Sequence, residues 1–196
     1  MTSERLTAFT DGVIAVIITI MVLEMRAPRG AELADLAALW PVFASYVLSF
    51  VYLGIYWNNH HHFFRLAPRV TGPVLWANLH LLFWLSLVPF TTAWLGEHAF
   101  APMPSAFYGL SLLACAIAWY IMQLALFRAK GPNLALKRAV GRDLKGKLSP
   151  FLYLAGIGLS FIAPLLAYAL YAAVAAMWLL PDRRVEAAVI HSESEG

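Results

Sequence analysis

Residues 3–28 read SERLTAFTDGVIAVIITIMVLEMRAP, and this stretch decides the fold. It is mostly apolar and is long enough to cross a bilayer as a helix. Arg5 precedes the apolar run, Asp11 lies within its first turns and Thr19 lies near its middle. Because an unpaired carboxylate in lipid costs about 2.5–3.5 kcal/mol on insertion scales, we expect Asp11 to have partners on other helices.

The composition extends this interpretation to the whole chain. Its 196 residues are 61% hydrophobic and only 13% charged, with a mean hydropathy of +0.70. Soluble domains average about 25% charged residues, so a membrane protein is predicted. The N-terminal run is too long for a cleaved signal peptide, and no small-residue cleavage site follows it.

The apolar runs predict an all-α protein with six transmembrane helices. A single domain over residues 1–182 contains all of them, and a disordered cytoplasmic tail over 183–196 follows. Pro89 is expected to kink the third helix, and Pro164 is expected to divide the last long run in two. The expected spans are 5–25, 36–64, 73–95, 105–127, 148–163 and 164–180.

The basic residues give the orientation. With six crossings and both termini in the cytoplasm, twelve Lys and Arg residues lie inside and two lie outside. This is the positive-inside pattern of multi-pass proteins. It explains the pI of about 9.1 without a nucleic-acid partner.

One face of the first helix collects small and branched side chains with a single hydroxyl. On a helical wheel, this stripe lies within about 90°, and Asp11 points about 140° away from Val16. Two interpretations stay open at this point, since the stripe suits ordinary helix packing as well as a pathway, and Asp11 suits a structural anchor as well as a ligand. The stripe comprises Gly12, Val16, Thr19, Ile20 and Leu23.

The second predicted helix ends in YWNNHHHFF, residues 56–64. By topology, this end lies on the same side of the membrane as Arg5 and Asp11. Trp57 is three and four residues before His60 and His61, and indole and imidazole N–H groups donate to carboxylates. We therefore expect partners of Asp11 among these side chains.

Other chemistries find little support in the sequence. Adjacent histidines on a helix point about 100° apart, which does not suit a shared metal ion, and His80 is the single deep candidate for a haem or quinone site. No nucleophile elbow or phosphate-binding glycine loop is present, so no enzyme is predicted. The potassium-filter sequence TVGYG is also missing.

Three motifs, in order, resemble the transmembrane protein 175 family of potassium channels. The first is Arg5-x-x-x-Phe9-Thr10-Asp11, in which the family has serine where Thr10 stands. The second is Trp57-x-x-His60-His61. The third lies in LWANLHLLFWLSLVPFTTAWLGE, residues 75–97, with its Asn and Pro-Phe pair.

The resemblance implies a weakly potassium-selective, passive cation channel in a bacterial inner membrane. Bacterial members are homotetramers in which four first helices line the pore, without a carbonyl filter or a cofactor. In the family, apolar side chains form the constriction and a threonine aids selectivity. The corresponding residues here are Val16 and Leu23 for the constriction and Thr19 for selectivity, with K⁺ passing near Thr19. The arginine and aspartate of the first motif, here Arg5 and Asp11, would join Trp57 and His60 or His61 in a buried network.

Two alternatives to a channel remain. Buried Asp and His side chains also relay protons in secondary transporters, although no broken-helix repeats are visible. A non-conducting scaffold or cofactor-binding membrane protein would use the stripe of the first helix for packing alone. Transport measurements in liposomes separate these possibilities.

Overall fold

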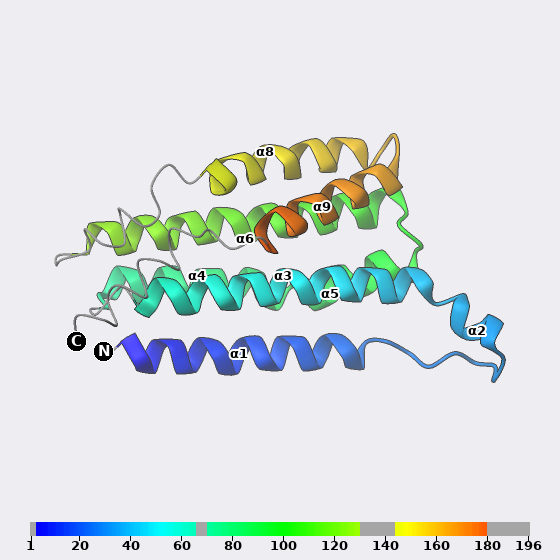
Figure 1. Cartoon of the computed structure of the whole chain (residues 1–196), viewed down its shortest axis with the longest axis horizontal. Helices are drawn as coiled ribbons and strands as arrows, with labels where there is room; N and C mark the ends of the chain where they lie inside the picture. The colour runs from blue at the N-terminus through cyan, green and yellow to red at the C-terminus, as the bar shows by residue number, and fades with distance from the viewer. Residues whose placement is uncertain (1–2, 66–69, 130–143, 180–196) are drawn as a thin grey trace.

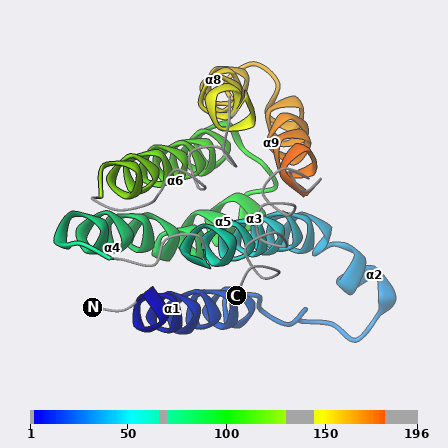
Figure 2. The same cartoon turned by 60° about the vertical axis from the view of Figure 1, so that its left-hand side comes forward.

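The computed structural model describes residues 3–65, 70–129 and 144–179, and within these ranges every regular element is a helix. Figure 1 shows three layers: α1 on one side, α3 with α4 and α5 in the middle, and α6, α8 and α9 on the other side. The turned view in Figure 2 shows the same layering. The helices are α1 Ser3–Leu23, α2 Leu33–Ala37, α3 Trp40–Arg65, α4 Gly72–Ser86, α5 Val88–Glu97, α6 Pro102–Arg128, α8 Leu144–Leu159 and α9 Pro164–Leu179.

Four helical stretches are long and apolar enough to cross a membrane: Ser3–Leu23, Trp40–Arg65, Gly72–Glu97 and Pro102–Arg128. The all-helical, multi-pass membrane architecture expected from the sequence is thus confirmed. Helices α8 and α9 have 16 residues each. At about 24 Å they are shorter than the roughly 30 Å hydrocarbon core, so the bilayer would have to be thinner where they cross it.

The second predicted span differs at its start. The apolar run predicts a start at Leu36, whereas α3 begins at Trp40 and a short helix, α2, precedes it. A capping box stabilises α2, because Glu32 and Asp35 each accept a bond from the other's backbone N–H. The turn between the two helices lets the chain enter α3 with Pro41 in its first turn, where a missing N–H is tolerated.

The third predicted span is broken where its proline was expected to bend it. Helix α4 ends at Ser86 and α5 begins at Val88, one residue before Pro89. Proline has no N–H to donate to the carbonyl four residues earlier, so the helix opens there. The hydroxyls of Thr91 and Thr92 donate to the Val88 carbonyl at 3.2 and 2.7 Å and tighten the turn that follows.

The last apolar run forms two helices that lie side by side and run in opposite directions (Figure 1). Helix α9 begins at Pro164, where the sequence places a helix start. Helix α8 begins at Leu144 and ends at Leu159, four residues before each expected boundary. The tail expected over 183–196 lies outside the described residues.

Tyr171 fixes the packing of α6, α8 and α9. Its fully buried ring lies against Gly109 of α6 and Gly156 of α8, where an added Cβ would overlap Tyr171 atoms. Its hydroxyl donates to the Ser105 carbonyl at 3.3 Å. The two glycines therefore leave the space that the tyrosine fills.

We expect Gly156→Val to prevent correct packing of this layer, because the branched side chain overlaps the rigid Tyr171 ring. Overpacking of this kind costs about 1–3 kcal/mol or more. Gly158→Val in the same helix is the control, since nothing lies within 4 Å of a Cβ there. Size-exclusion chromatography in detergent measures the folded fraction. Equal yields of the two variants would contradict this view of the packing.

Candidate functional site

Helix α1 has one buried face and one exposed face. The buried side chains recur every three or four residues and pack against α3, α4 and α5; they are Leu6, Thr10, Ile14, Ile17 and Met21. The stripe predicted from the sequence lies on the exposed face, where Val16 is 55% exposed and Leu23 is 80% exposed. Gly12, Thr19 and Ile20 are exposed there too. Such a face meets lipid, another subunit or a pathway.

The hydroxyl of Thr19 is oriented by its own helix. It donates to the Val16 carbonyl at 2.9 Å. Because the hydroxyl hydrogen is used in this bond, the oxygen presents its lone pairs to the surroundings and acts as an acceptor. An exposed acceptor oxygen on an otherwise apolar face is chemically suited to a passing cation.

A groove of about 830 Å³ separates α1 from α5. Gly12, Val16 and Ile20 line one wall, and Pro89 and Phe90 line the other. Thr19 and Leu23 are not among the residues that line it. The groove therefore borders only part of the stripe.

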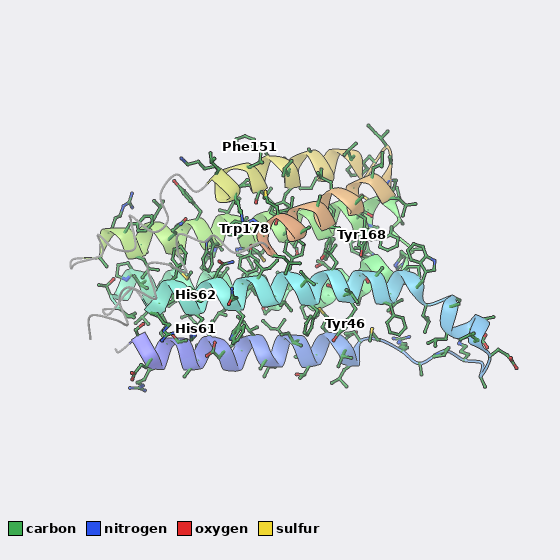
Figure 3. The ribbon with its side chains drawn as sticks, in the orientation of Figure 1. Tyr46, His61, His62, Phe151, Tyr168 and Trp178 are labelled. Carbon is green, nitrogen blue, oxygen red and sulfur yellow. The ribbon has the colours of Figure 1, made fainter. Side chains whose placement is uncertain are left out.

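Asp11 lies on the flank of α1, half-buried, and is held by α3. The indole Nε1 of Trp57 donates to the Asp11 Oδ1 at 3.0 Å. The His61 ring lies against Trp57, with 6.4 Å between ring centroids. Figure 3 shows His61 on α3 beside the amino end of α1. The structure thus brings together Asp11, Trp57 and His61 as neighbours across two helices.

His60 belongs to a different, fully buried set of hydrogen bonds. Its Nε2 bonds the Asn78 Oδ1 at 2.9 Å, and the Asn78 amide donates to the Thr10 hydroxyl at 3.0 Å. Helices α1, α3 and α4 are joined in this way, and His60 stacks on Phe64 with 4.3 Å between centroids. The sequence predicts His60 or His61 as a partner of Asp11 and assigns no role to Asn78. The sequence does contain a signal for Asn78, because a polar amide side chain within a mainly apolar run indicates a functional or structural partner.

Arg5 and Phe9 differ from the rest of their motif, because both are exposed on the surface of the subunit. The expected network includes Arg5, yet its guanidinium has no hydrogen bond or ion pair with any residue that the structure describes.

The histidines do not form a metal centre among the described residues, where no three His, Cys, Asp or Glu side chains are grouped to hold an ion. His80 accepts a hydrogen bond from the Trp84 indole at 2.9 Å. Its Nε2 is therefore occupied by this hydrogen bond.

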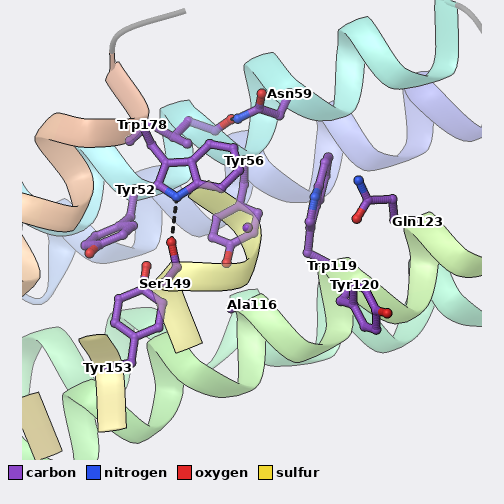
Figure 4. Close-up of a pocket in the computed structure, with 12 residues that line it drawn as sticks. Tyr52, Tyr56, Asn59, Ala116, Trp119, Tyr120, Gln123, Ser149, Tyr153 and Trp178 are labelled. Carbon is purple, nitrogen blue, oxygen red and sulfur yellow. Dashed lines mark hydrogen bonds between the residues drawn. The ribbon is translucent and has the colours of Figure 1, made fainter. Parts of the chain in front are cut away.

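A small cavity of about 40 Å³ lies within the subunit between α3, α6, α8 and α9 (Figure 4). Its walls are largely aromatic, and the Trp178 indole donates to the Ser149 hydroxyl at 2.9 Å across it. This volume suits one or two water molecules. The cavity has no wall from α1 and adds no residue to the stripe.

The sequence of this chain is similar to the sequences of known proteins. A family model described as the endosomal/lysosomal potassium channel TMEM175 matches residues 5–89. A potassium channel from Chryseobacterium sp. is 50% identical over 95% of this chain and 97% of its own length. A Streptomyces collinus potassium channel is 33% identical over 83% of this chain and 85% of its own.

A more distant relative and a solved structure agree with these matches. The mouse endosomal/lysosomal proton channel TMEM175 is 28% identical over 65% of this chain and 28% of its own length. The crystal structure of a lysosomal potassium-selective channel TMEM175 homologue from Chamaesiphon minutus superposes with a TM-score of 0.80 at 29% identity, over 92% of this chain and 97% of that one. The chain therefore belongs to the TMEM175 family.

Proposed function

We propose that this protein is a weakly selective potassium channel that conducts passively along the exposed face of α1. The observation that carries the proposal is the pattern on that helix: one face packs on its own subunit, and the other is an uncovered apolar stripe with a single hydroxyl. The bacterial relatives named potassium channels support potassium as the permeant ion. No catalytic chemistry and no cofactor are needed for this activity.

The pathway requires several copies of α1. We propose a homotetramer with six crossings per subunit, in which the four α1 helices surround a central axis. The groove between α1 and α5 would receive the neighbouring subunit, which buries Ile20 and one side of Val16. Thr19 and Leu23, which do not line the groove, would then face the axis.

The constriction would be formed by rings of apolar side chains. A narrow Val16 ring excludes water when the channel is closed, and it widens to pass a partly hydrated ion when the channel is open. Leu23, two turns further along, forms a second apolar layer. Thr19 lies between the two rings and supplies oxygen atoms, so a transient K⁺ position would lie beside it.

The charged groups at the start of α1 would hold the assembly rather than line the pathway. Asp11 is already bound by Trp57 at 3.0 Å, off the stripe. Arg5 has no partner among the described residues of its subunit, and we place its partner on a neighbouring chain. The location would be a bacterial inner membrane with both termini in the cytoplasm, as the distribution of Lys and Arg indicates.

Flux through liposomes tests the function. Purified protein in potassium-loaded vesicles is expected to release K⁺ faster than Na⁺, without any coupled substrate or proton gradient. Flux that saturates and depends on a proton gradient would instead indicate a transporter. A flux carried by protons alone would indicate a proton channel, as the mouse relative is named. The absence of any flux would indicate a scaffold.

Replacing Thr19 by valine is expected to lower the K⁺/Na⁺ flux ratio, because valine keeps the shape and removes the acceptor oxygen. We expect the ratio to fall by about three-fold or more, since a lost hydroxyl contact to an ion is worth about 1 kcal/mol. Thr7→Val is the control, because the Thr7 hydroxyl also donates to a backbone carbonyl, at 3.1 Å, and lies outside the stripe. An unchanged ratio in Thr19→Val would remove the hydroxyl from the selectivity mechanism.

A further inference from the structure

The outer surface between α4 and α6 carries a second groove, of about 860 Å³, far from the stripe of α1. Its walls are mainly apolar and include Trp76 and Ala77 of α4 and Ile121, Leu124 and Ala125 of α6. Among the residues that the structure describes, no acidic side chain lines it. Because α4 and α6 pack tightly against each other, the groove is a shallow channel along their shared surface.

One end of this groove carries a positive charge. Arg128, in the last turn of α6, lines that end, is exposed, and has no hydrogen bond or ion pair with any described residue. Thr71 lies at the same end as the N-cap of α4, and its side chain makes no capping bond. This is the end of the bundle at which α1 begins (Figure 1).

The length of the groove matches one leaflet of a membrane. It follows α4 from Thr71 to His80 and α6 from Ala129 back to Ile121. Each path is about 12–14 Å long, close to half of a 30 Å hydrocarbon core. Trp76, 75% exposed, lies about halfway along the groove, where its large apolar ring is available to an acyl chain.

We propose that this groove binds an anionic phospholipid. The phosphate would pair with the Arg128 guanidinium, which binds phosphate through two parallel N–H bonds, while one acyl chain lies along Trp76, Leu124 and Ile121. The deep end suits a hydrocarbon chain, because Ala77 and Ile121 line it beside His80, whose Nε2 accepts a hydrogen bond from Trp84. A lipid with net negative charge is preferred over a zwitterionic one, since Arg128 is a cation and the described lining residues include no anion.

Native mass spectrometry of the purified oligomer tests this proposal. The protein is titrated with phosphatidylglycerol or phosphatidylcholine of identical acyl chains. We expect the first lipid bound to favour phosphatidylglycerol by about five-fold, and Arg128→Gln to abolish that preference. Lys147→Gln is the matched control: it removes one exposed positive charge near the start of α8, outside the groove, and the preference should persist.

A second variant tests the groove itself. Ala125→Phe keeps Arg128 and fills the apolar channel, so binding of both lipids at this position should weaken. Equal loss in Arg128→Gln and Lys147→Gln, or equal binding of the two lipids by the unchanged protein, would overturn the proposal. So would disulfide cross-linking of Leu124→Cys between two copies, which would make the groove a subunit contact; the native Cys115 is buried and does not interfere. None of these outcomes depends on ion conduction.

Discussion

Potassium flux is expected to fall about ten-fold or more when Val16 is replaced by phenylalanine. In the proposed tetramer the substitution places four aromatic rings at the narrowest point of the pathway. A wider apolar plug raises the cost of wetting the constriction and leaves less room for a hydrated ion. Because Val16 is 55% exposed in the subunit, the larger side chain has space and should not disturb folding.

The control for this experiment is Val47→Phe. Val47 lies on α3 and is 56% exposed, so the two positions share residue type, substitution and exposure. Flux is measured in liposomes at equal protein content, and the oligomer is checked by size-exclusion chromatography. Unchanged flux in Val16→Phe, or an equal decrease in both variants, would remove Val16 from the constriction.

The largest expected loss of stability comes from Asn78→Leu. This asparagine is fully buried and joins three helices, since its carbonyl oxygen bonds His60 and its amide donates to Thr10. Leucine has a similar size but no polar atom, so both partners would be left without a hydrogen bond inside the bundle. Each buried group left unsatisfied costs about 1–3 kcal/mol.

We expect the midpoint of thermal unfolding in detergent to fall by about 5–10 °C. Asn58→Leu is the control, because Asn58 is exposed on the neighbouring α3 and the same substitution there removes no buried bond. A midpoint within 1–2 °C of the unchanged protein would show that the bonds of Asn78 add little, as for weak hydrogen bonds between membrane helices, which average about 0.6 kcal/mol.

The sequence predicts the helices well, because apolar runs of about 20 residues leave few other structures in a membrane. Proline also gave reliable boundaries, since Pro164 begins α9 and Pro89 follows the break between α4 and α5. The short helix α2 was missed, although Glu32 and Asp35 have capping-box spacing. Its five residues are too few to show a periodic pattern.

The polar contacts of the candidate site were only partly accessible. Spacing placed Trp57 and His61 on one side of their helix, and the structure places both near Asp11. Spacing alone does not decide whether His60 or His61 lies near Asp11, because the two residues are adjacent and point about 100° apart. The position of α4 decides it, because Asn78 on that helix forms a hydrogen bond with His60.

The stripe of α1 was predicted from periodicity alone, and the structure shows that its residues are exposed in the subunit. Its role stays a prediction, because exposure is compatible with lipid, a neighbouring subunit or a pore. A helical wheel does not show which residues of the stripe lie beside α5. In the structure, Val16 and Ile20 line the groove next to α5, and Thr19 and Leu23 do not. That asymmetry arises from the packing of α5 beside α1.

A structure of the purified oligomer in lipid nanodiscs tests the central claim most directly. The account predicts four copies around one axis, with Thr19 and Leu23 of each α1 facing that axis and Val16 at its narrowest point. The Asp11 carboxylate would lie off the axis on Trp57. An assembly in which Val16, Thr19 and Leu23 contact lipid, or in which another helix surrounds the axis, would contradict it.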